Sequence, residues 1–307
     1  MNKRDHGGGL DAAVATYGGV RSDWLDLSTG INPVPYPVGE ISPEAWTALP
    51  DQGAMDRLLA AARAFWNVPD GAAIVAANGA SAIIAAMPHI WSGQRALIPT
   101  PTYNEHAAAF AANGWDVVPE GMGDVTIVVH PNNPDGRVWQ VSHDPKPVII
   151  DESFCEVLTE ASHVDIATAP DTIVLKSFGK FWGLAGARLG FAICTPDLAR
   201  KVQDQLGPWS VSGPALEIGA RALEDVAWAE ATRVRLAADA KRLDDLVGWK
   251  LVGGTDLFRT YEVPDAAAMQ DKLARGHVWS RIFPYSKTWI RLGLPAPDRW
   301  EQLEAAL

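Results

Sequence analysis

The sequence has few cysteines, few basic residues and no long apolar run, and each shortage excludes a class of protein. Two cysteines, Cys155 and Cys194, cannot build a disulfide framework, and their apolar surroundings predict reduced thiols in a cytoplasmic protein. Lysine and arginine number 26 against 37 acidic residues, so no basic stripe is present to bind a nucleic acid. No run of about 18 apolar residues and no signal-peptide segment occur, which predicts no membrane partner.

Along the chain, short apolar runs typical of strands alternate with segments whose apolar residues have the period of a helix. Runs that predict buried strands span residues 73–77, 96–98, 125–129, 148–150 and 172–175. Helical patterns span residues 44–66, 81–90 and 104–113. A strand at 188–194 follows its predecessor too closely for a helical crossover, which favours an antiparallel direction. The alternation predicts an α/β fold with a mostly parallel sheet, whose ligand lies at the carboxyl ends of the strands.

The pattern changes after Gly207-Pro208. One or two long helices are predicted over 214–247, followed by strands at 250–263, 277–283 and 289–294 around a final pair of helices. We therefore predict an irregular N-terminal arm over 1–40 that packs with the small domain, a large ligand-binding domain over 41–206 and a smaller α+β domain over 207–307. The stretch from Gly136 to Val148 is too short for a crossover helix and predicts a bare loop.

The most informative segment is SFGKFWGLAGARLG at 177–190. A strand ends at Ser177, Lys180 follows, and a glycine-rich turn leads to Arg188. A lysine that forms an imine with an aldehyde must be partly desolvated at such a place, so that its amine is available near neutral pH. Ser177 and Arg188 can supply a hydroxyl and a bidentate cation to a phosphate. By itself, the segment is also compatible with an ordinary turn that carries a surface lysine.

Four further motifs stand at the ends of other predicted strands. Asp151 follows the strand at 148–150, where a carboxylate can keep a pyridine nitrogen protonated, although an aspartate there is more often a helix cap. Asn133, in the turn HPNNPDG, can donate to a phenolic oxygen. The segment Gly79, Ala80 and Ser81 joins a strand to a helix start that suits a phosphate, and Tyr103 can stack on a ring.

These five motifs have the order and rough spacing found in the fold-type I enzymes that depend on pyridoxal 5′-phosphate (PLP), the aspartate-aminotransferase-like superfamily. The chain resembles that superfamily over nearly its whole length. The resemblance implies the PLP-dependent transferase fold, with a large domain and a smaller α+β domain. It implies Lys180 as the catalytic lysine that bonds to PLP and moves a proton, Asp151 on the pyridine nitrogen, Asn133 on the ring hydroxyl and Tyr103 over the ring. The residues that it implies around the phosphate are Gly79, Ala80, Ser81, Ser177 and Arg188.

Two subfamilies are similar to this chain, the histidinol-phosphate aminotransferases and the threonine-phosphate decarboxylases. The segments HGGGL at 6–10 and STGINP at 28–33 resemble the decarboxylase opening and imply His6 and Asn32 as substrate residues, although Gly9 stands where asparagine is usual. Phe154, in place of the tyrosine common in the aminotransferases, also favours the decarboxylases. Arg281 and Arg291, in two successive predicted strands, imply a small phosphorylated amino-acid substrate in either subfamily.

The resemblance thus favours decarboxylation of L-threonine O-3-phosphate to 1-amino-2-propanol O-2-phosphate, a step of cobalamin biosynthesis. An aminotransferase of the histidinol-phosphate type and a non-catalytic PLP-binding homologue are the alternatives. The resemblance also implies a homodimer, in which an aromatic side chain of the second subunit reaches the phosphate. That aromatic should fall near residues 49–51, where this chain has Leu49 in place of tyrosine. No metal site is predicted.

Overall fold

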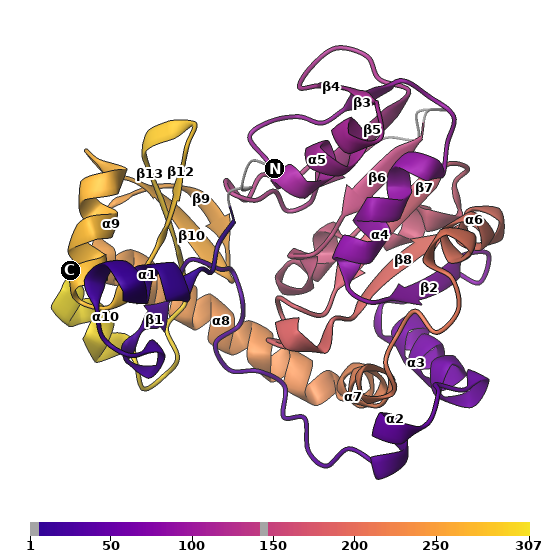
Figure 1. Ribbon diagram of the computed structural model, residues 1–307, viewed down its shortest axis with the longest axis horizontal. Helices are drawn as coiled ribbons and strands as arrows, with labels where there is room; N and C mark the ends of the chain where they lie inside the picture. Colours follow the sequence, from indigo (N-terminus) through magenta and orange to yellow (C-terminus); the bar gives the residue numbers. More distant parts are fainter. Residues whose placement is uncertain (1–5, 142–146) are drawn as a thin grey trace. The chain divides into compact units, whose positions relative to one another are not determined.

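Residues 6–141 and 147–307 are described by a computed structural model, in which the chain forms two compact units (Figure 1). The larger unit comprises Tyr36–Asn133 and Val138–Glu230. The smaller unit comprises the described residues up to Pro35, together with Pro134–Arg137 and Ala231–Leu307. Helix α8 (Val226–Val247) carries the chain from the larger unit into the smaller one.

The predicted division differs from the two units at residues 36–40, which belong to the larger unit, and at Pro134–Arg137, which belongs to the smaller one. The largest difference is at residues 207–230. These residues belong to the larger unit, although the texture of the sequence changes at 207. The reason is that α7 (Gly213–Glu224) packs extensively against α3 (Gln52–Phe65), which precedes it by about 150 positions in the chain. A change of local pattern therefore marks the start of a new helix here and not the start of the smaller unit.

A seven-stranded sheet forms the centre of the larger unit, in the order β2-β8-β7-β6-β5-β3-β4 (Figure 1). Its strands are β2 (Ala73–Ala77), β3 (Arg95–Leu97), β4 (Asp116–Val118), β5 (Val125–Val129), β6 (Val148–Asp151), β7 (Thr172–Ser177) and β8 (Gly190–Cys194). The pairs from β4 through β3, β5 and β6 to β7 are parallel, and β8 runs antiparallel between β7 and β2. The predicted α/β fold with a mostly parallel sheet is confirmed.

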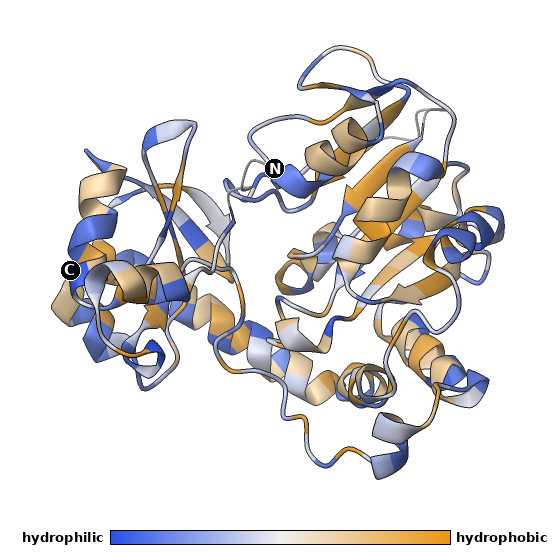
Figure 2. Ribbon diagram, viewed as in Figure 1, coloured by the Kyte–Doolittle hydropathy of each residue, from blue (hydrophilic) through white to orange (hydrophobic). Residues whose placement is uncertain are grey.

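Helices of the larger unit pack against this sheet and build its core. They are α2 (Pro43–Thr47), α3 (Gln52–Phe65), α4 (Ala80–Ala86), α5 (Asn104–Ala112), α6 (Pro196–Leu206) and α7 (Gly213–Glu224). Side chains of α4, α5 and α6, such as Ile83, Phe110 and Val202, pack on sheet residues such as Ile149 and Ile173 in one buried cluster. Figure 2 shows the strands mainly in the hydrophobic colour, as expected for strands covered on both faces.

The predicted helix over 44–66 is wrong as a single element. It is interrupted between α2 and α3, because Pro50 has no N–H to continue a helix and Asp51 starts a new one. The Asp51 carboxylate accepts a hydrogen bond from the N–H of Ala54 at 3.0 Å, which is the usual N-cap interaction. Strand β4 and helix α6 were not predicted. Residues 137–141 have no regular secondary structure, and the rest of the predicted loop before β6 lies partly outside the described residues.

The smaller unit is an α+β arrangement, as predicted. Its four-stranded antiparallel sheet has the order β12-β13-β10-β9, and β1 pairs with β11 in parallel. These strands are β1 (Leu25–Asp26), β9 (Lys250–Thr255), β10 (Phe258–Glu262), β11 (Val278–Trp279), β12 (Arg281–Phe283) and β13 (Ser286–Gly293). Its helices, besides the C-terminal part of α8, are α1 (Leu10–Tyr17), α9 (Ala266–Arg275) and α10 (Trp300–Ala306).

The expectation of an irregular N-terminal arm is wrong for α1 and β1. Helix α1 forms because Leu10 and Ala13 bury against Trp24 and Ala274, in a small apolar cluster of the same unit. Glycines on both sides of the helix hid this pattern in the sequence. Among the described residues, no helix has both the length and the apolar composition needed to cross a bilayer.

Candidate active site

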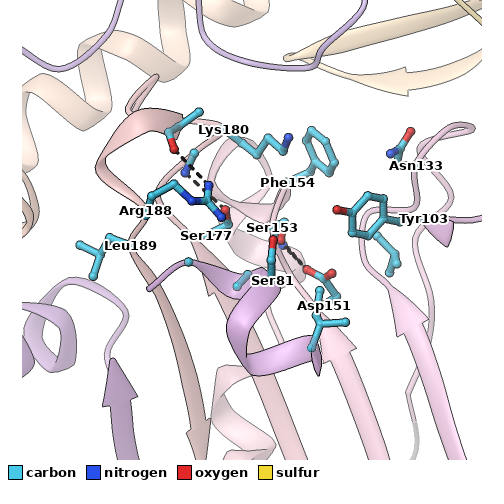
Figure 3. A pocket seen from close by; sticks show the side chains of 16 residues that line it. Ser81, Tyr103, Asn133, Asp151, Ser153, Phe154, Ser177, Lys180, Arg188 and Leu189 are labelled. Atoms are coloured by element: carbon cyan, nitrogen blue, oxygen red, sulfur yellow. Dashed lines mark hydrogen bonds between the residues drawn. The ribbon is translucent and has the colours of Figure 1, made fainter. Parts of the chain in front are cut away.

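One pocket in the larger unit gathers all nine residues that the resemblance assigned to PLP (Figure 3). They line it together with seven others, among them Ser153 and Phe154. The nine are Gly79, Ala80, Ser81, Tyr103, Asn133, Asp151, Ser177, Lys180 and Arg188. They follow or end β2, β3, β5, β6 and β7 or precede β8, so the pocket lies at the carboxyl ends of the parallel strands, where ligands of α/β sheets bind.

Asp151 ends β6 and is held as a buried carboxylate. Its Oδ2 lies 2.8 Å from Nε2 of His106, and its Oδ1 accepts hydrogen bonds from the N–H and hydroxyl of Ser153 at 3.0 and 2.5 Å. Burial pushes the pKa of Asp151 upwards, but His106 and Ser153 outweigh it, so the pKa lies below its usual value. A negative charge is therefore maintained on this wall of the pocket.

His106 is a site residue that the sequence did not reveal. It lies in α5, three positions after Tyr103, and its side chain is fully buried. Nothing in the local pattern AAAFAA marks this histidine as functional, and only the tertiary structure brings α5 against the end of β6. Its one available signal was its position three residues after the ring-stacking candidate Tyr103, the N-cap residue of α5, and the two ring centroids lie 6.2 Å apart in the structure.

Lys180 is half-buried and reaches into the pocket from the turn after β7. Its Nζ lies 5.4 Å from the ring centroid of Phe154, which is buried (Figure 3). An aromatic ring without a hydroxyl gives the amine an apolar neighbour on that side. This ring therefore contributes to the partial desolvation that a nucleophilic lysine requires.

Arg188 and Ser177 mark another end of the pocket (Figure 3). Arg188 has a left-handed backbone with φ of 51°, which is uncommon outside glycine, and its Nη1 donates to the carbonyl oxygen of Ala185 at 3.1 Å. Its guanidinium passes so close to Gly79 that a Cβ on that residue would lie 2.6 Å from Nη2. Gly79 also has φ of 82°, so the backbone conformation favours glycine there, and a Cβ would displace the end of the Arg188 side chain.

A buried ion pair lies on the opposite side of the same strand ends. Because successive residues of a strand point to opposite faces, Glu152 and Lys176 point away from the pocket that Asp151 and Ser177 line. Lys176 Nζ lies 2.7 Å from Oε2 of Glu152 and 3.3 Å from Oε1 of Glu156. Burial raises the pKa of Glu152, but Lys176 and hydrogen bonds from His163 lower it to about 2.

Replacing Lys176 by methionine is expected to lower the free energy of unfolding by about 3–5 kcal/mol at pH 7. The variant removes the cation that two buried carboxylates share. In the wild type, the stabilisation from Glu152 is present above the ordinary glutamate pKa and is lost as the pH falls towards about 2. In the variant these carboxylates take up protons at higher pH. The difference in free energy of unfolding between the wild type and the variant should therefore shrink as the pH falls from 7 to 4. Urea unfolding measures this free energy, and Lys201→Met, at an exposed lysine, is the control. Equal stability of the wild type and Lys176→Met at pH 7 would contradict the prediction.

A nearby group of possible metal ligands does not form an open metal site. His130, Glu152 and Cys155 have ligand atoms within 4.8 Å of one another. Glu152 is bound to Lys176, and His130 accepts from the N–H of Trp139 and contacts the carbonyl oxygen of Ala161. Burial raises the pKa of the Cys155 thiol, which opposes the thiolate that a metal needs. These atoms are engaged in the hydrogen bonding of the core.

The four predicted substrate residues all lie in the smaller unit. Arg281 and Arg291 are direct partners across β12 and β13, a like-charge pair that an anion would stabilise. Arg291 is buried, its Nη2 donates to the carbonyl oxygen of Ser28 at 2.6 Å, and burial together with Arg281 lowers its pKa to about 10. Arg281 Nη1 donates to the carbonyl oxygen of His6 at 2.8 Å.

The N-terminal segment that includes His6 is held against the same residues. The N–H of Gly8 donates to the hydroxyl of Ser28 at 2.6 Å, and Trp279 Nε1 donates to the carbonyl oxygen of Gly8 at 3.0 Å. Gly9, which replaces the usual asparagine, has φ of 82° and ψ of 29°. Asparagine is the other residue that adopts this left-handed conformation readily, so the departure preserves the backbone at the start of α1.

The polar groups of the pocket match the chemistry of PLP. A buried carboxylate suits a protonated pyridine nitrogen, a guanidinium with two hydroxyls suits a phosphate, and a half-buried lysine lies within the same pocket. A mostly parallel α/β sheet with this set at the carboxyl ends of its strands defines the fold-type I class of PLP-dependent enzymes. The chain belongs to the aminotransferase class I and II family, whose model matches residues 123–307.

The known proteins that are similar to this chain include decarboxylases and aminotransferases. The chain is 38% identical to the threonine-phosphate decarboxylase of Pseudomonas aeruginosa, over 99% of this chain and 97% of that protein. It is 37% identical to the threonine-phosphate decarboxylase of a Sinorhizobium species, over 95% and 93% of the two chains. The crystal structure of histidinol-phosphate aminotransferase from Sinorhizobium meliloti in complex with pyridoxal-5′-phosphate has a TM-score of 0.83 at 17% identity, covering 98% of this chain and 93% of that one. The last likeness concerns the fold alone.

Proposed function

We propose that this protein is a PLP-dependent decarboxylase that converts L-threonine O-3-phosphate into 1-amino-2-propanol O-2-phosphate and CO₂. The observation that carries the proposal is the single pocket that joins Lys180, Asp151 and Arg188. The choice of decarboxylation over amino transfer is supported by the identity to two threonine-phosphate decarboxylases along almost the whole chain. The reaction would place the protein in cobalamin biosynthesis.

Each group of the pocket has a separate task in this proposal. When bound, PLP withdraws electrons from the substrate and weakens the Cα bond that stands perpendicular to its ring. Asp151 keeps a proton on the pyridine nitrogen, and His106 and Ser153 hold the carboxylate in place for it. Arg188, Ser177, Ser81 and the backbone of Gly79 and Ala80 hold the phosphate of PLP, Asn133 donates to the ring hydroxyl, and Tyr103 covers the ring. Lys180 Nζ anchors the cofactor and returns a proton to Cα after CO₂ has left.

The smaller unit supports the proposed substrate class. Arg281 and Arg291, opposite one another on neighbouring strands, form a doubly positive site for a phosphate, and His6 and Asn32 belong to the same unit. If these residues hold the substrate phosphate, the carboxylate of the substrate is free to leave the plane of the ring. This is the orientation that decarboxylation needs, whereas an aminotransferase must direct a Cα–H bond there.

The proposal is tested by following CO₂ from purified protein with PLP and L-threonine O-3-phosphate, with no keto acid added. We expect release over many turnovers, with the amino alcohol phosphate formed in equal amount. Release that stops below one equivalent would contradict it. Amino transfer from histidinol phosphate to 2-oxoglutarate would then assign the protein to the aminotransferase alternative, and a yellow protein without turnover would support a non-catalytic role.

The proposal includes a homodimer that works in the cytoplasm. Exposed apolar side chains favour a second subunit: Trp46 and Leu49, beside the hollow lined by α2, α3 and α7, are 67% and 68% exposed. Leu49 lies where the resemblance places an aromatic that reaches a neighbouring subunit. Sedimentation equilibrium would give twice the 33.0 kDa mass of the chain for a dimer, and a monomer mass would refute this part of the proposal.

A further inference from the structure

Two of the hydrogen bonds to the Asp151 carboxylate come from one residue, Ser153, which also lines the pocket (Figure 3). The N–H and the hydroxyl of Ser153 both donate to Oδ1 of Asp151, at 3.0 and 2.5 Å. Nε2 of His106 lies 2.8 Å from the other oxygen, Oδ2, and it must donate, because a carboxylate only accepts. The hydroxyl contact has the length of a charge-assisted hydrogen bond, which is about twice as strong as a neutral one.

The two oxygens of this carboxylate differ in the room that they leave for a further donor. Each oxygen of an ionised carboxylate can accept about two hydrogen bonds. Oδ1 has two donors and is therefore filled, whereas Oδ2 has one donor among the residues that the structure describes. A ring nitrogen that carries a proton would thus bind to Oδ2.

We propose that Ser153 is a positioning residue that reserves Oδ2 of Asp151 for the pyridine nitrogen of PLP and keeps the shared proton on that nitrogen. The inference rests on the proposed role of Asp151 and deepens it. The hydroxyl of Ser153 stabilises the negative charge of the carboxylate and so makes it a weaker base. A proton shared between the carboxylate and the ring then stays on the ring, where it strengthens the withdrawal of electrons.

The electrostatics of the pocket make the hydroxyl of Ser153 necessary for this effect. Burial is the largest influence on the pKa of Asp151 and raises it, but His106 and Ser153 together hold the pKa below its usual value. Lys180 and Arg188 are the cationic side chains that line the same pocket. Without the hydroxyl, burial is opposed by one donor fewer, so the carboxylate of Asp151 should take up a proton at higher pH.

The same kind of hydrogen bond occurs on the opposite side of the strand ends and supplies a matched control. The hydroxyl of Ser162 donates to Oε2 of Glu152 at 2.7 Å, and Glu152 is a buried carboxylate that points away from the pocket. Ser162→Ala therefore removes a hydroxyl from a buried carboxylate, as Ser153→Ala does, but leaves Asp151 unchanged. Ser153→Thr keeps the hydroxyl and is the conservative variant.

The first readout of the test does not depend on turnover. The holoenzyme is loaded with PLP that carries ¹⁵N in its ring, and the NMR shift of this nitrogen reports whether it holds a proton. The wild type, Ser153→Thr and Ser162→Ala should give the signal of a protonated nitrogen. In Ser153→Ala the signal should move towards that of the unprotonated ring.

The second readout is the pH profile of CO₂ release. In Ser153→Ala, kcat for L-threonine O-3-phosphate should fall about tenfold, the effect of one charge-assisted hydrogen bond, while KM stays within about twofold of the wild type. Because Asp151 then takes up a proton at higher pH, the acid limb of kcat should move upwards by about one pH unit. Ser153→Thr should restore both values, and Ser162→Ala should change neither.

The outcomes separate the inference from the proposals on which it rests. If Asp151→Asn changes the ring-nitrogen signal and Ser153→Ala does not, the inference fails and the role of Asp151 stands. If neither variant changes the signal, the role of Asp151 fails and the inference with it. Equal behaviour of Ser153→Thr and Ser153→Ala would also overturn the inference, because the hydroxyl would then have no effect. If the wild type releases no CO₂ but the signals differ as expected, the inference stands and the proposed reaction is wrong.

Discussion

Lys180→Ala is expected to abolish CO₂ release from L-threonine O-3-phosphate, with kcat reduced by about a thousandfold or more. Lys180 is the lysine among the residues that line the pocket, and its amine has two tasks, to anchor PLP and to move the proton at Cα. In the variant no amine remains to bond to PLP, and water would have to move the proton. The half-buried position of Lys180 makes the substitution mild for the fold.

The control for this prediction is Lys201→Ala, which removes an exposed lysine of α6 and should leave kcat unchanged. PLP should still bind to Lys180→Ala through Asp151 and the groups around Arg188, and equilibrium dialysis can show that the cofactor is retained. Steady-state CO₂ release measures the effect. Retention of more than a tenth of the wild-type kcat would rule out Lys180 as the catalytic lysine.

Asp151→Asn is expected to lower kcat by about a hundredfold or more, while the protein stays folded. The amide has nearly the shape of the carboxylate, but it carries no charge to keep a proton on the pyridine nitrogen. Because His106 and Ser153 hold the pKa of Asp151 below its usual value, the wild type should keep this charge throughout the ordinary working range of pH. Protonation of Asp151 should therefore lower the activity only when the pH falls below the usual pKa of an aspartate.

The matched control is Asp165→Asn, the same change of charge at an exposed position of the larger unit. The absorption spectrum of bound PLP reports the protonation of the ring and should change in Asp151→Asn but not in the control. A wild-type kcat in Asp151→Asn would show that the carboxylate has no part in the reaction. A smaller loss is expected for His106→Gln, because the charge remains and only its orientation is weakened.

The residues of the PLP pocket were predictable because each follows or ends a strand. Strands of a parallel sheet end at the same edge, so the local patterns allowed Lys180, Asp151 and Asn133 to lie together, and the resemblance to the fold-type I enzymes implied that they do. The structure brings all nine predicted residues into one pocket. The predicted fold is confirmed for the same reason, since continuous apolar strands with short connections allow few arrangements.

Contacts between distant segments could not be predicted. His106 meets Asp151 across 45 positions, and Lys176 meets Glu152 because β6 and β7 are neighbours in the sheet. Local patterns also misplaced the helix over 44–66, where α2 ends at Thr47 and Asp51 caps the start of α3. The period of apolar residues does not reveal a helix cap within a helical pattern. It also does not reveal which residue a polar side chain will contact.

The sequence by itself determined the strand ends that carry Lys180, Asp151 and Arg188, because periodicity and turn chemistry are properties of neighbouring residues. Only the tertiary structure decided that Arg281 and Arg291 lie directly opposite one another and that Arg235 donates a hydrogen bond to Asn32. Register between strands and the packing of a helix against a distant loop depend on the whole buried surface of a unit. No local pattern contains that information.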